Sequence, residues 1–415
     1  MSFVRLALRN LARNRRRTAA TLAVVAAGTV ALVLTAGFVR FSFDGLREAM
    51  IHGGLGHLEV ASRAAVESKG AAALDRPLAE ALADWRPLAE RLARLDHVVA
   101  VGANLQVLGL AQNASGASFS FVGVGVEPAR ERAMGFETRL REGAPLPEAA
   151  PAPGEETALL ARGLAASLGV GVGDVVTLVA TNAGGMLNAL DVRILGIVTT
   201  GVAELDTRYL KVHLATAGRL LQTDRASNLL VGLDDTAATD ATLAAARAAL
   251  AGSAPALAVT PWTERALFYE QVKNLYSGIF WFLGSIVFVL VVLAASNTLA
   301  MTVMERVREI GTLRAIGTGR GQLAAMILAE ALWLGLLGAA AGGVAGLAAT
   351  AALNAAGLRM PPPPGAVDPI DLQLAYVPEA YAAAALLMVV VLAVAALAPI
   401  ARAVRLSIVE ALGHV

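Results

Sequence analysis

Cysteine is absent from the 415-residue chain, and lysine occurs only at Lys69, Lys211 and Lys273. The chain therefore forms no disulfide and offers no thiolate to a metal ion. No lysine lies in a GxxxxGK[ST] sequence, so the chain has no P-loop for ATP. The five histidines lack the spacing of metal ligands. No Ser/His/Asp set, paired carboxylates or HExxH motif stands out. We expect no catalytic site, no metal site and no cofactor bound by this chain.

A formal net charge of only +1 gives no reason to expect a nucleic-acid partner. What the chain has in excess is apolar residues, which make up 56% of it and give a mean hydropathy of +0.62. That is too apolar for a soluble protein of this size and indicates several membrane spans, with lipid as a partner.

Four apolar runs predict transmembrane helices at 18–39, 275–303, 323–353 and 379–401. The remaining segments are an amphipathic interfacial helix at 1–17, a domain with stalk segments at 40–274, a coupling helix at 304–322, an outer loop at 354–378 and a tail at 402–415. The outer loop contains four prolines at 361–364, a stiff spacer. The alternative for the first run is a cleavable signal peptide, but roughly 22 apolar residues favour a retained span.

The orientation follows from arginine placement. Arg306, Arg308, Arg314 and Arg320 lie between the second and third runs, so the positive-inside rule places this segment in the cytoplasm. Both termini are then cytosolic, and the domain at 40–274 is extracytoplasmic.

The domain at 40–274 alternates strand-like and helical patterns, which predicts a mixed α/β fold. Strand-like runs occur at 57–60, 98–108, 119–126, 175–180, 192–198 and 229–233. Helical patterns occur at 78–95, 157–168 and 237–250. A Pro/Ala-rich stretch at 145–153 is interpreted as a seam between two lobes.

The segment 297–317, NTLAMTVMERVREIGTLRAIG, places charged side chains on one helical face and Val303, Val307 and Ile310 on another. Glycines at 311, 317, 319 and 321 are expected to break or bend the helix. The plain alternative is a charged flank that stops membrane transfer. The segment resembles the signature of the FtsX/MacB permease superfamily, the membrane subunits of type VII ABC transporters. RNLARNRRR at 9–17 and the final stretch from Pro399 resemble the same family.

This resemblance implies a permease of the bacterial inner membrane with a MacB-like periplasmic core domain between the first two spans. Its partners would be two copies of an ABC ATPase, which bind ATP and Mg²⁺, and a second permease, identical or homologous. Force would pass from the ATPase to the outer domain (mechanotransmission). The residues expected to couple to the ATPase are Glu305, Arg306, Arg308, Glu309, Gly311, Arg314 and Gly317.

The stretches at 56–60, 159–178 and 192–201 resemble the LolC/LolE lipoprotein-releasing branch. This favours lipoprotein or other hydrophobic cargo. The alternative function is an FtsX-like regulator of an extracytoplasmic partner such as a cell-wall hydrolase. In the LolC/LolE branch a protruding hook contacts a chaperone, and the matching place here is 181–190. Met186 and Leu187 would form an exposed contact tip there, or else an ordinary hairpin turn.

Two features of the third run have open interpretations. Gly338, Gly342 and Gly346 form a ridge of small residues, for packing inside the subunit or at a dimer seam. Glu330 lies about two turns into the run, where an ionisable residue is a functional candidate. A structural capping role or a dimer contact is favoured over proton transport, because no second buried ionisable residue is visible to relay a proton.

Overall fold

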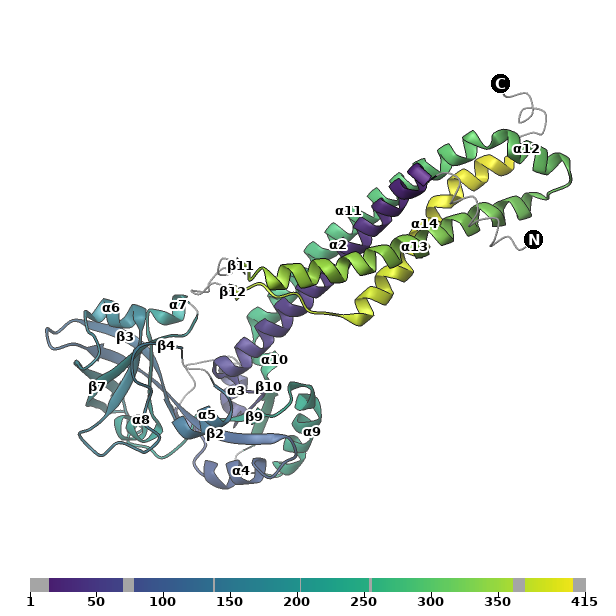
Figure 1. Cartoon of the computed structure of the whole chain (residues 1–415). Coiled ribbons are helices and arrows are strands. Elements are labelled where there is room, and N and C mark those ends of the chain that lie inside the picture. Colours follow the sequence, from purple (N-terminus) through teal and green to yellow (C-terminus); the bar gives the residue numbers. More distant parts are fainter. Residues whose placement is uncertain are drawn as a thin grey trace. The chain divides into compact units, whose positions relative to one another are not determined.

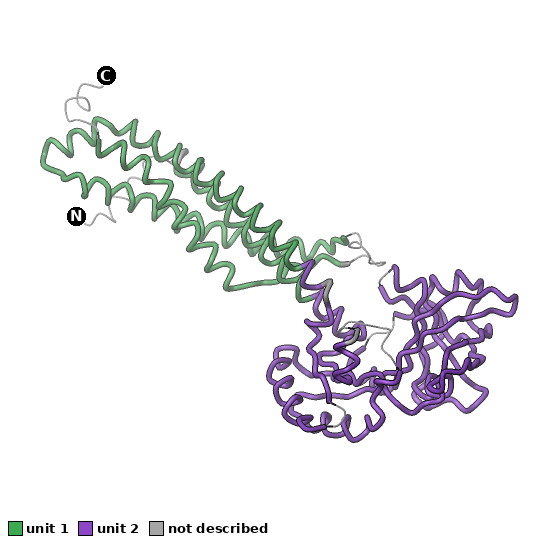
Figure 2. The backbone as a smooth tube through the Cα atoms, turned by 180° about the vertical axis from the view of Figure 1, so that it is seen from behind, with its two compact units in different colours: residues 1–44, 273–360, 371–415 green, residues 45–272, 361–370 purple. Residues whose placement is uncertain are grey.

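The computed structural model describes residues 15–69, 78–136, 139–201, 203–253, 256–360 and 370–405. Its contacts divide the chain into two compact units, coloured separately in Figure 2. Unit 1 comprises residues 1–44, 273–360 and 371–415, and unit 2 comprises residues 45–272 and 361–370. Residues 1–14 of the expected interfacial helix, the prolines at 361–364 and residues 406–415 of the tail lie outside the described residues.

The apolar runs form long helices. These are α2 (Arg15–Met50), α11 (Leu267–Glu305), α13 (Arg320–Ala355) and α14 (Pro378–Arg405), with the short α12 (Val307–Ala315) between α11 and α13 (Figure 1). By length and composition, four helices among the described residues can cross a membrane. Even α14, the shortest at 28 residues, spans about 42 Å at a rise of ~1.5 Å per residue, more than the ~30 Å hydrocarbon core.

Side chains from all four long helices share one apolar core within unit 1. Val25 of α2, Val291 of α11, Leu334 of α13 and Met388 of α14 belong to it, and each is almost fully buried. Much apolar surface of α11 remains outside this core, as expected for a helix facing lipid or a partner helix.

A proline inside α14 is compensated by a side chain from α11. Pro399 has no N–H, so it cannot donate to the carbonyl of Ala395 one turn earlier. Ser296 Oγ donates a hydrogen bond to that carbonyl over 2.8 Å. In an apolar environment an unpaired carbonyl is costly, so this contact makes the proline tolerable.

The described end of the outer loop is fixed to the helices of unit 1. Asn354, near the end of α13, donates from Nδ2 to the Leu374 carbonyl over 3.0 Å and accepts from the Leu374 N–H over 2.7 Å. The next N–H, of Ala375, donates to the Gly37 carbonyl of α2. The short strands β11 (Arg359–Met360) and β12 (Ile370–Asp371) flank the undescribed part of the loop.

Unit 2 contains two lobes that share one long strand. In the first lobe an antiparallel sheet has the order β10-β1-β9-β2, built from β10 (Leu257–Pro261), β1 (Leu58–Ser62), β9 (Asn228–Leu233) and the first half of β2 (Val98–Gln112). Alternation gives the sheet two buried faces. Leu229 and Val231 pack with α4 (Trp85–Leu92) and α9 (Thr239–Ala249), whereas Leu230 packs with Met134, after α5 (Pro128–Ala133).

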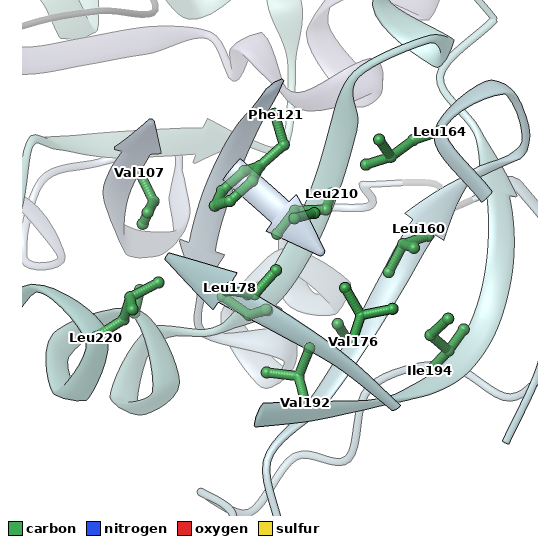
Figure 3. Packing of buried hydrophobic residues seen from close by; sticks show 14 of the residues in the cluster. Val107, Phe121, Leu160, Leu164, Val176, Leu178, Val192, Ile194, Leu210 and Leu220 are labelled. Carbon is green, nitrogen blue, oxygen red and sulfur yellow. The ribbon is translucent and has the colours of Figure 1, made fainter. Parts of the chain in front are cut away.

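The second lobe is a closed barrel. The second half of β2 pairs with β3 (Ser118–Val126), and the ring continues through β8 (Tyr209–His213), β5 (Thr157–Ala161), β7 (Leu187–Thr199) and β6 (Val175–Thr181), which pairs again with β2. Figure 3 shows apolar side chains from these strands, among them Phe121, Leu178 and Leu210, converging inside. α6 (Arg162–Leu168) and α8 (Leu214–Leu221) contribute Leu164 and Leu220 to the same core.

The remaining elements are short. They are the π-helical turn η1 (Ile51–Leu55), α3 (Arg63–Lys69), η2 (Leu78–Glu80), β4 (Arg139–Gly143), which pairs with β7, α7 (Ala203–Asp206), η3 (Thr236–Ala238) and α10 (Trp262–Arg265).

Three expectations for the domain were wrong in detail. The pattern at 157–168 is a strand, β5, followed by a helix, α6, because a short apolar run satisfies either period. The pattern at 78–95 contains only η2 and α4 as helices. The stretch at 145–153 connects β4 to β5, which both belong to the barrel lobe, so it is no seam. The two lobes meet instead along β2.

Candidate functional site

The segment between α11 and α13 is a short helix with defined ends. α11 stops at Glu305, and Arg306 has φ −104° and ψ 12°, outside helical geometry. α12 ends in a Schellman motif: the N–H of Gly317 donates to the Arg314 carbonyl and the N–H of Thr318 to the Leu313 carbonyl. Gly317 has φ +99°, which favours glycine.

The glycines differ in what they do. Gly319 caps the start of α13, where Gln322 Oε1 accepts its backbone N–H over 3.1 Å. Gly311 is buried inside α12, and Gly321 lies in the first turn of α13, so neither breaks a helix. The break before α12 occurs at Arg306, which is not a glycine.

The two faces of α12 have different environments. Val307 and Ile310 of α12 are buried, as is Val303 near the end of α11; Val303 and Ile310 pack with Leu323 of α13 and Ala403 of α14. On the other side Arg308 and Thr312 of α12 are exposed, as is Glu305 at the end of α11, while Glu309 and Arg314 are half-buried. The helix is therefore anchored to unit 1 on one face and presents charged groups on the other.

Arg306 binds carboxylates of two helices through its guanidinium group. Its Nε lies 2.9 Å from Glu309 Oε2 in α12, and its Nη1 lies 3.0 Å from Glu330 Oε1 in α13. The side chains of Arg306 and Glu330 are only 18% and 9% exposed. The sequence showed no second buried ionisable residue near Glu330; the structure supplies one, Arg306, from the helix break between α11 and α12. A guanidinium bound to the buried carboxylate of Glu330 weakens the argument for proton transport.

The glycine ridge of α13 lies against α2 of the same chain. A Cβ atom added at Gly338 would lie 2.7 Å from Val25 Cβ, and one at Gly342 would lie 2.6 Å from Thr29 Cβ. At Gly346 the same atom would lie 3.7 Å from Val33 Cβ. Small residues allow this close approach of two helices. Of the two interpretations, packing inside the subunit is what these contacts show.

The hairpin between β6 and β7 carries both features considered for it. Asn182 Oδ1 accepts the N–H groups of Gly184 and Met186, and Asn182 Nδ2 donates to Gln222 Oε1, so the turn is well ordered. Met186 and Leu187 are nevertheless 65% and 78% exposed. An ordinary turn therefore presents two adjacent apolar side chains to the surroundings.

Unit 2 also contains a buried polar junction that sequence reasoning missed. Glu59 of β1 is fully buried, and its Oε2 lies 3.1 Å from Arg265 Nε. Arg265 Nη1 donates to the Leu55 carbonyl, and Asn228 Nδ2 donates to Glu59. Leu55 ends the turn after α2, and Arg265 immediately precedes α11. The ion pair thus joins the two chain segments that lead to the membrane helices.

His57 extends this junction toward the end of α2. Its Nδ1 accepts the Leu233 N–H, so the neutral ring carries its proton on Nε2, 3.1 Å from Thr236 Oγ1. Thr236 in turn donates to Glu48 Oε1. Burial lowers the pKa of His57 to about 4. Nε2 carries the proton and faces Thr236 as a donor. His57 therefore does not act as a base toward Thr236, which fits a structural role.

Among the residues that the structure describes, no group of three or more His, Cys, Asp or Glu side chains is placed to hold a metal ion.

Four helices able to cross a membrane, an α/β domain inserted between the first two, and a short charged helix between the second and third define a permease-type membrane protein. The MacB-like periplasmic core domain family matches residues 18–249, and the FtsX-like permease C-terminal family matches residues 246–408. The chain belongs to the FtsX/MacB superfamily of ABC transporter permeases, whose members are generally non-catalytic components.

The chain is 27% identical over 202 residues to the lipoprotein-releasing system transmembrane protein LolC of Neisseria meningitidis serogroup B. The match covers 47% of this chain and 48% of LolC, so it spans about half the length of that relative. Among solved structures, the periplasmic region of MacB from Actinobacillus actinomycetemcomitans is 15% identical, with a TM-score of 0.36, covering 54% of this chain and 96% of that one. The extracellular domain of YknZ from Gram-positive bacteria is 13% identical, with a TM-score of 0.34, covering 49% and 98%.

Proposed function

We propose that this chain is the permease subunit of an ABC transporter in the bacterial inner membrane. A separate ATPase, in two copies with bound ATP and Mg²⁺, pushes on α12, and the movement reshapes the extracytoplasmic unit 2. A second permease, identical or homologous, completes the membrane part. The observation that carries the proposal is α12 itself, a helix buried against the bundle on one face and charged on the other.

The proposed orientation rests on the arginines of unit 1. Arg306, Arg308, Arg314 and Arg320 lie at the α12 end, and Arg402 and Arg405 lie at the end of α14 beside it (Figure 1). At the opposite end, Arg359 is compensated by Asp371, with Nε 3.1 Å from Oδ1. By the positive-inside rule the α12 end is cytoplasmic.

The test is a charge reversal on the exposed face of α12. Arg308→Glu should reduce copurification of the ATPase with a tagged permease, because a charged contact desolvated in an interface costs about 2–5 kcal/mol when one partner is lost. Arg359→Glu is the matched control, since it reverses the same charge at the other end of unit 1. Equal ATPase recovery for wild type, Arg308→Glu and Arg359→Glu would contradict docking at α12.

For the cargo we propose a lipoprotein or another hydrophobic substrate, contacted at the β6–β7 tip. The support is the pair of exposed side chains, Met186 and Leu187, on a turn fixed by Asn182. Changing both to Ser should reduce release of lipoprotein from spheroplasts while leaving ATPase activity and membrane insertion unchanged. Unaltered release would remove the reason for a contact at this tip.

A further inference from the structure

Arg306 occupies the single residue between two helices. Its N–H donates to the Val303 carbonyl and its carbonyl accepts from the Ile310 N–H, so the last turn of α11 and the first turn of α12 share one residue. The direction of α12 relative to α11 therefore depends on the backbone angles at Arg306. A residue outside helical geometry keeps such angles when its surroundings hold it.

The surroundings that hold Arg306 are the two carboxylates. Glu309 lies within α12, three residues from Arg306, so this pair stays inside the segment that would move. Glu330 lies 24 residues away, on α13, so this pair connects the segment to a different helix. The planar guanidinium presents donors in a fixed fork, so it can bind both carboxylates at once, with the Glu330 contact being the one that reaches another helix.

Burial makes the connection to Glu330 strong. The Glu330 side chain is 9% exposed, and Ile327, Ala331 and Leu334, at neighbouring positions of α13, are nearly fully buried. The Arg306 and Glu330 side chains are both largely withheld from water, so separating them costs the carboxylate a charge-assisted contact that little water can replace. Apolar packing of α12 against α13 also holds the two helices together, but unlike the ion pair it has no fixed direction.

We propose that the Arg306–Glu330 pair makes α12 and α13 move as one rigid body when the ATPase acts on α12. Arg306 is thus a positioning residue for the proposed coupling site. This inference rests on the proposed function for its role in coupling, whereas the rigid connection itself can be measured without an ATPase.

The first experiment measures rigidity in the permease alone. The cysteine-free chain allows two spin labels, on Thr312→Cys of α12 and Leu336→Cys of α13, both at exposed positions. In the otherwise unchanged protein, in lipid nanodiscs, the distance distribution should be narrow. Glu330→Leu should widen it about twofold or more. Glu309→Leu is the matched control, because it removes the other partner of Arg306 and leaves the connection to α13, and it should keep the distribution narrow.

The second experiment uses the permease purified with its ATPase. Vanadate trapping with ATP should leave the distance between the two labels unchanged, as for a rigid body. For Glu330→Leu, ATPase recovery and the KM for ATP should stay within about twofold, while kcat changes by about tenfold, because coupling is lost and docking is kept. Glu330→Gln, which retains an oxygen for Arg306 Nη1, should return kcat to within about threefold.

The outcomes separate the two proposals. An unchanged distance distribution in Glu330→Leu, or the same widening in Glu309→Leu, overturns the rigid connection. A narrow distribution with no ATPase recovered from wild type supports the connection and overturns the proposed function. If Glu330→Leu does not accumulate, Arg306→Met, which keeps the apolar stem, provides the same comparison.

Discussion

The close approach of α13 to α2 makes a sharp prediction for two adjacent glycines. A Cβ at Gly342 would lie 2.6 Å from Thr29 Cβ and 2.7 Å from the Ala26 carbonyl oxygen, closer than side chains approach. A Cβ at Gly343 would meet Tyr381 Cδ1 at 3.9 Å, an ordinary contact. The two positions share one helix and one depth, so Gly343→Ala is the matched control for Gly342→Ala.

The expected magnitude is a difference between the two variants. Each substitution gains about 1 kcal/mol from the greater helix propensity of alanine. Only Gly342→Ala must displace α2, and inserting a methyl group into a packed interior costs about 1–3 kcal/mol. Gly343→Ala should therefore be neutral or slightly stabilising. Gly342→Ala should be less stable than Gly343→Ala by about 1–3 kcal/mol.

The assay is thermal unfolding of the detergent-solubilised protein, followed by size-exclusion recovery after heating.

A cross-link tests whether the seam between α13 and α2 lies inside one chain. A Cβ at Gly346 would lie 3.7 Å from Val33 Cβ. The two Cβ atoms of a disulfide are usually about 3.5–4.5 Å apart. Val33→Cys with Gly346→Cys should therefore oxidise within a single chain, on a background without other cysteines. Equal stability of Gly342→Ala and Gly343→Ala, or a cross-linked dimer, would refute the packing argument.

Three further changes test polar contacts. Ser296→Ala should lower stability by about 1–2 kcal/mol, because the Ala395 carbonyl before the proline loses its donor; Ser285→Ala, whose hydroxyl bonds within its own helix, should change little in the same thermal assay. Lowering the pH from 6.5 to 4 should lower the free energy of unfolding by about 3 kcal/mol through His57. In this range the ring is protonated in the unfolded chain, whereas its lowered pKa keeps it largely neutral in the folded protein. Denaturation of His57→Asn at both pH values should lack this part of the loss, and an identical loss in the variant would contradict it. Glu59→Leu should reduce the stability of unit 2 strongly, by about 3–5 kcal/mol, because the buried Arg265 loses the carboxylate 3.1 Å from its Nε, and limited proteolysis would show it.

Much of this architecture could be predicted because it depends on period and length. The four apolar runs exceed what a bilayer requires, and their helices occur where the runs are. Strand-like runs located six of the ten strands described in unit 2: the expected run at 119–126 is β3 at Ser118–Val126, and that at 229–233 is β9 at Asn228–Leu233. At 157–168 the hydrophobic pattern wrongly predicted a single helix. Five residues of strand precede seven of helix there, and each element is too short for its hydrophobic periodicity to be recognised.

The polar contacts could not be predicted from the sequence. Hydrophobic periodicity shows which face of a helix is buried, but not which residue of another element a polar side chain contacts. Arg306 and Glu330 are 24 residues apart, Ser296 and Ala395 are 99 apart, and the carboxylate of Glu59 meets an arginine near the other end of the domain. Each contact depends on how two elements pack. One signal was available in the sequence: Pro399 inside an apolar run requires a donor for the carbonyl one turn earlier.

α13 runs without interruption through unit 1, over 36 residues from Arg320 to Ala355. Near one end Glu330 binds Arg306 beside α12, and near the other Asn354 holds the Leu374 backbone at both its N–H and its carbonyl. These two contacts are separated by about 36 Å at a rise of ~1.5 Å per residue, which exceeds the ~30 Å hydrocarbon core. In the proposed orientation, and with the proposed rigid connection, a displacement of α12 is therefore carried to the outer loop along one helix that has a polar contact near each end.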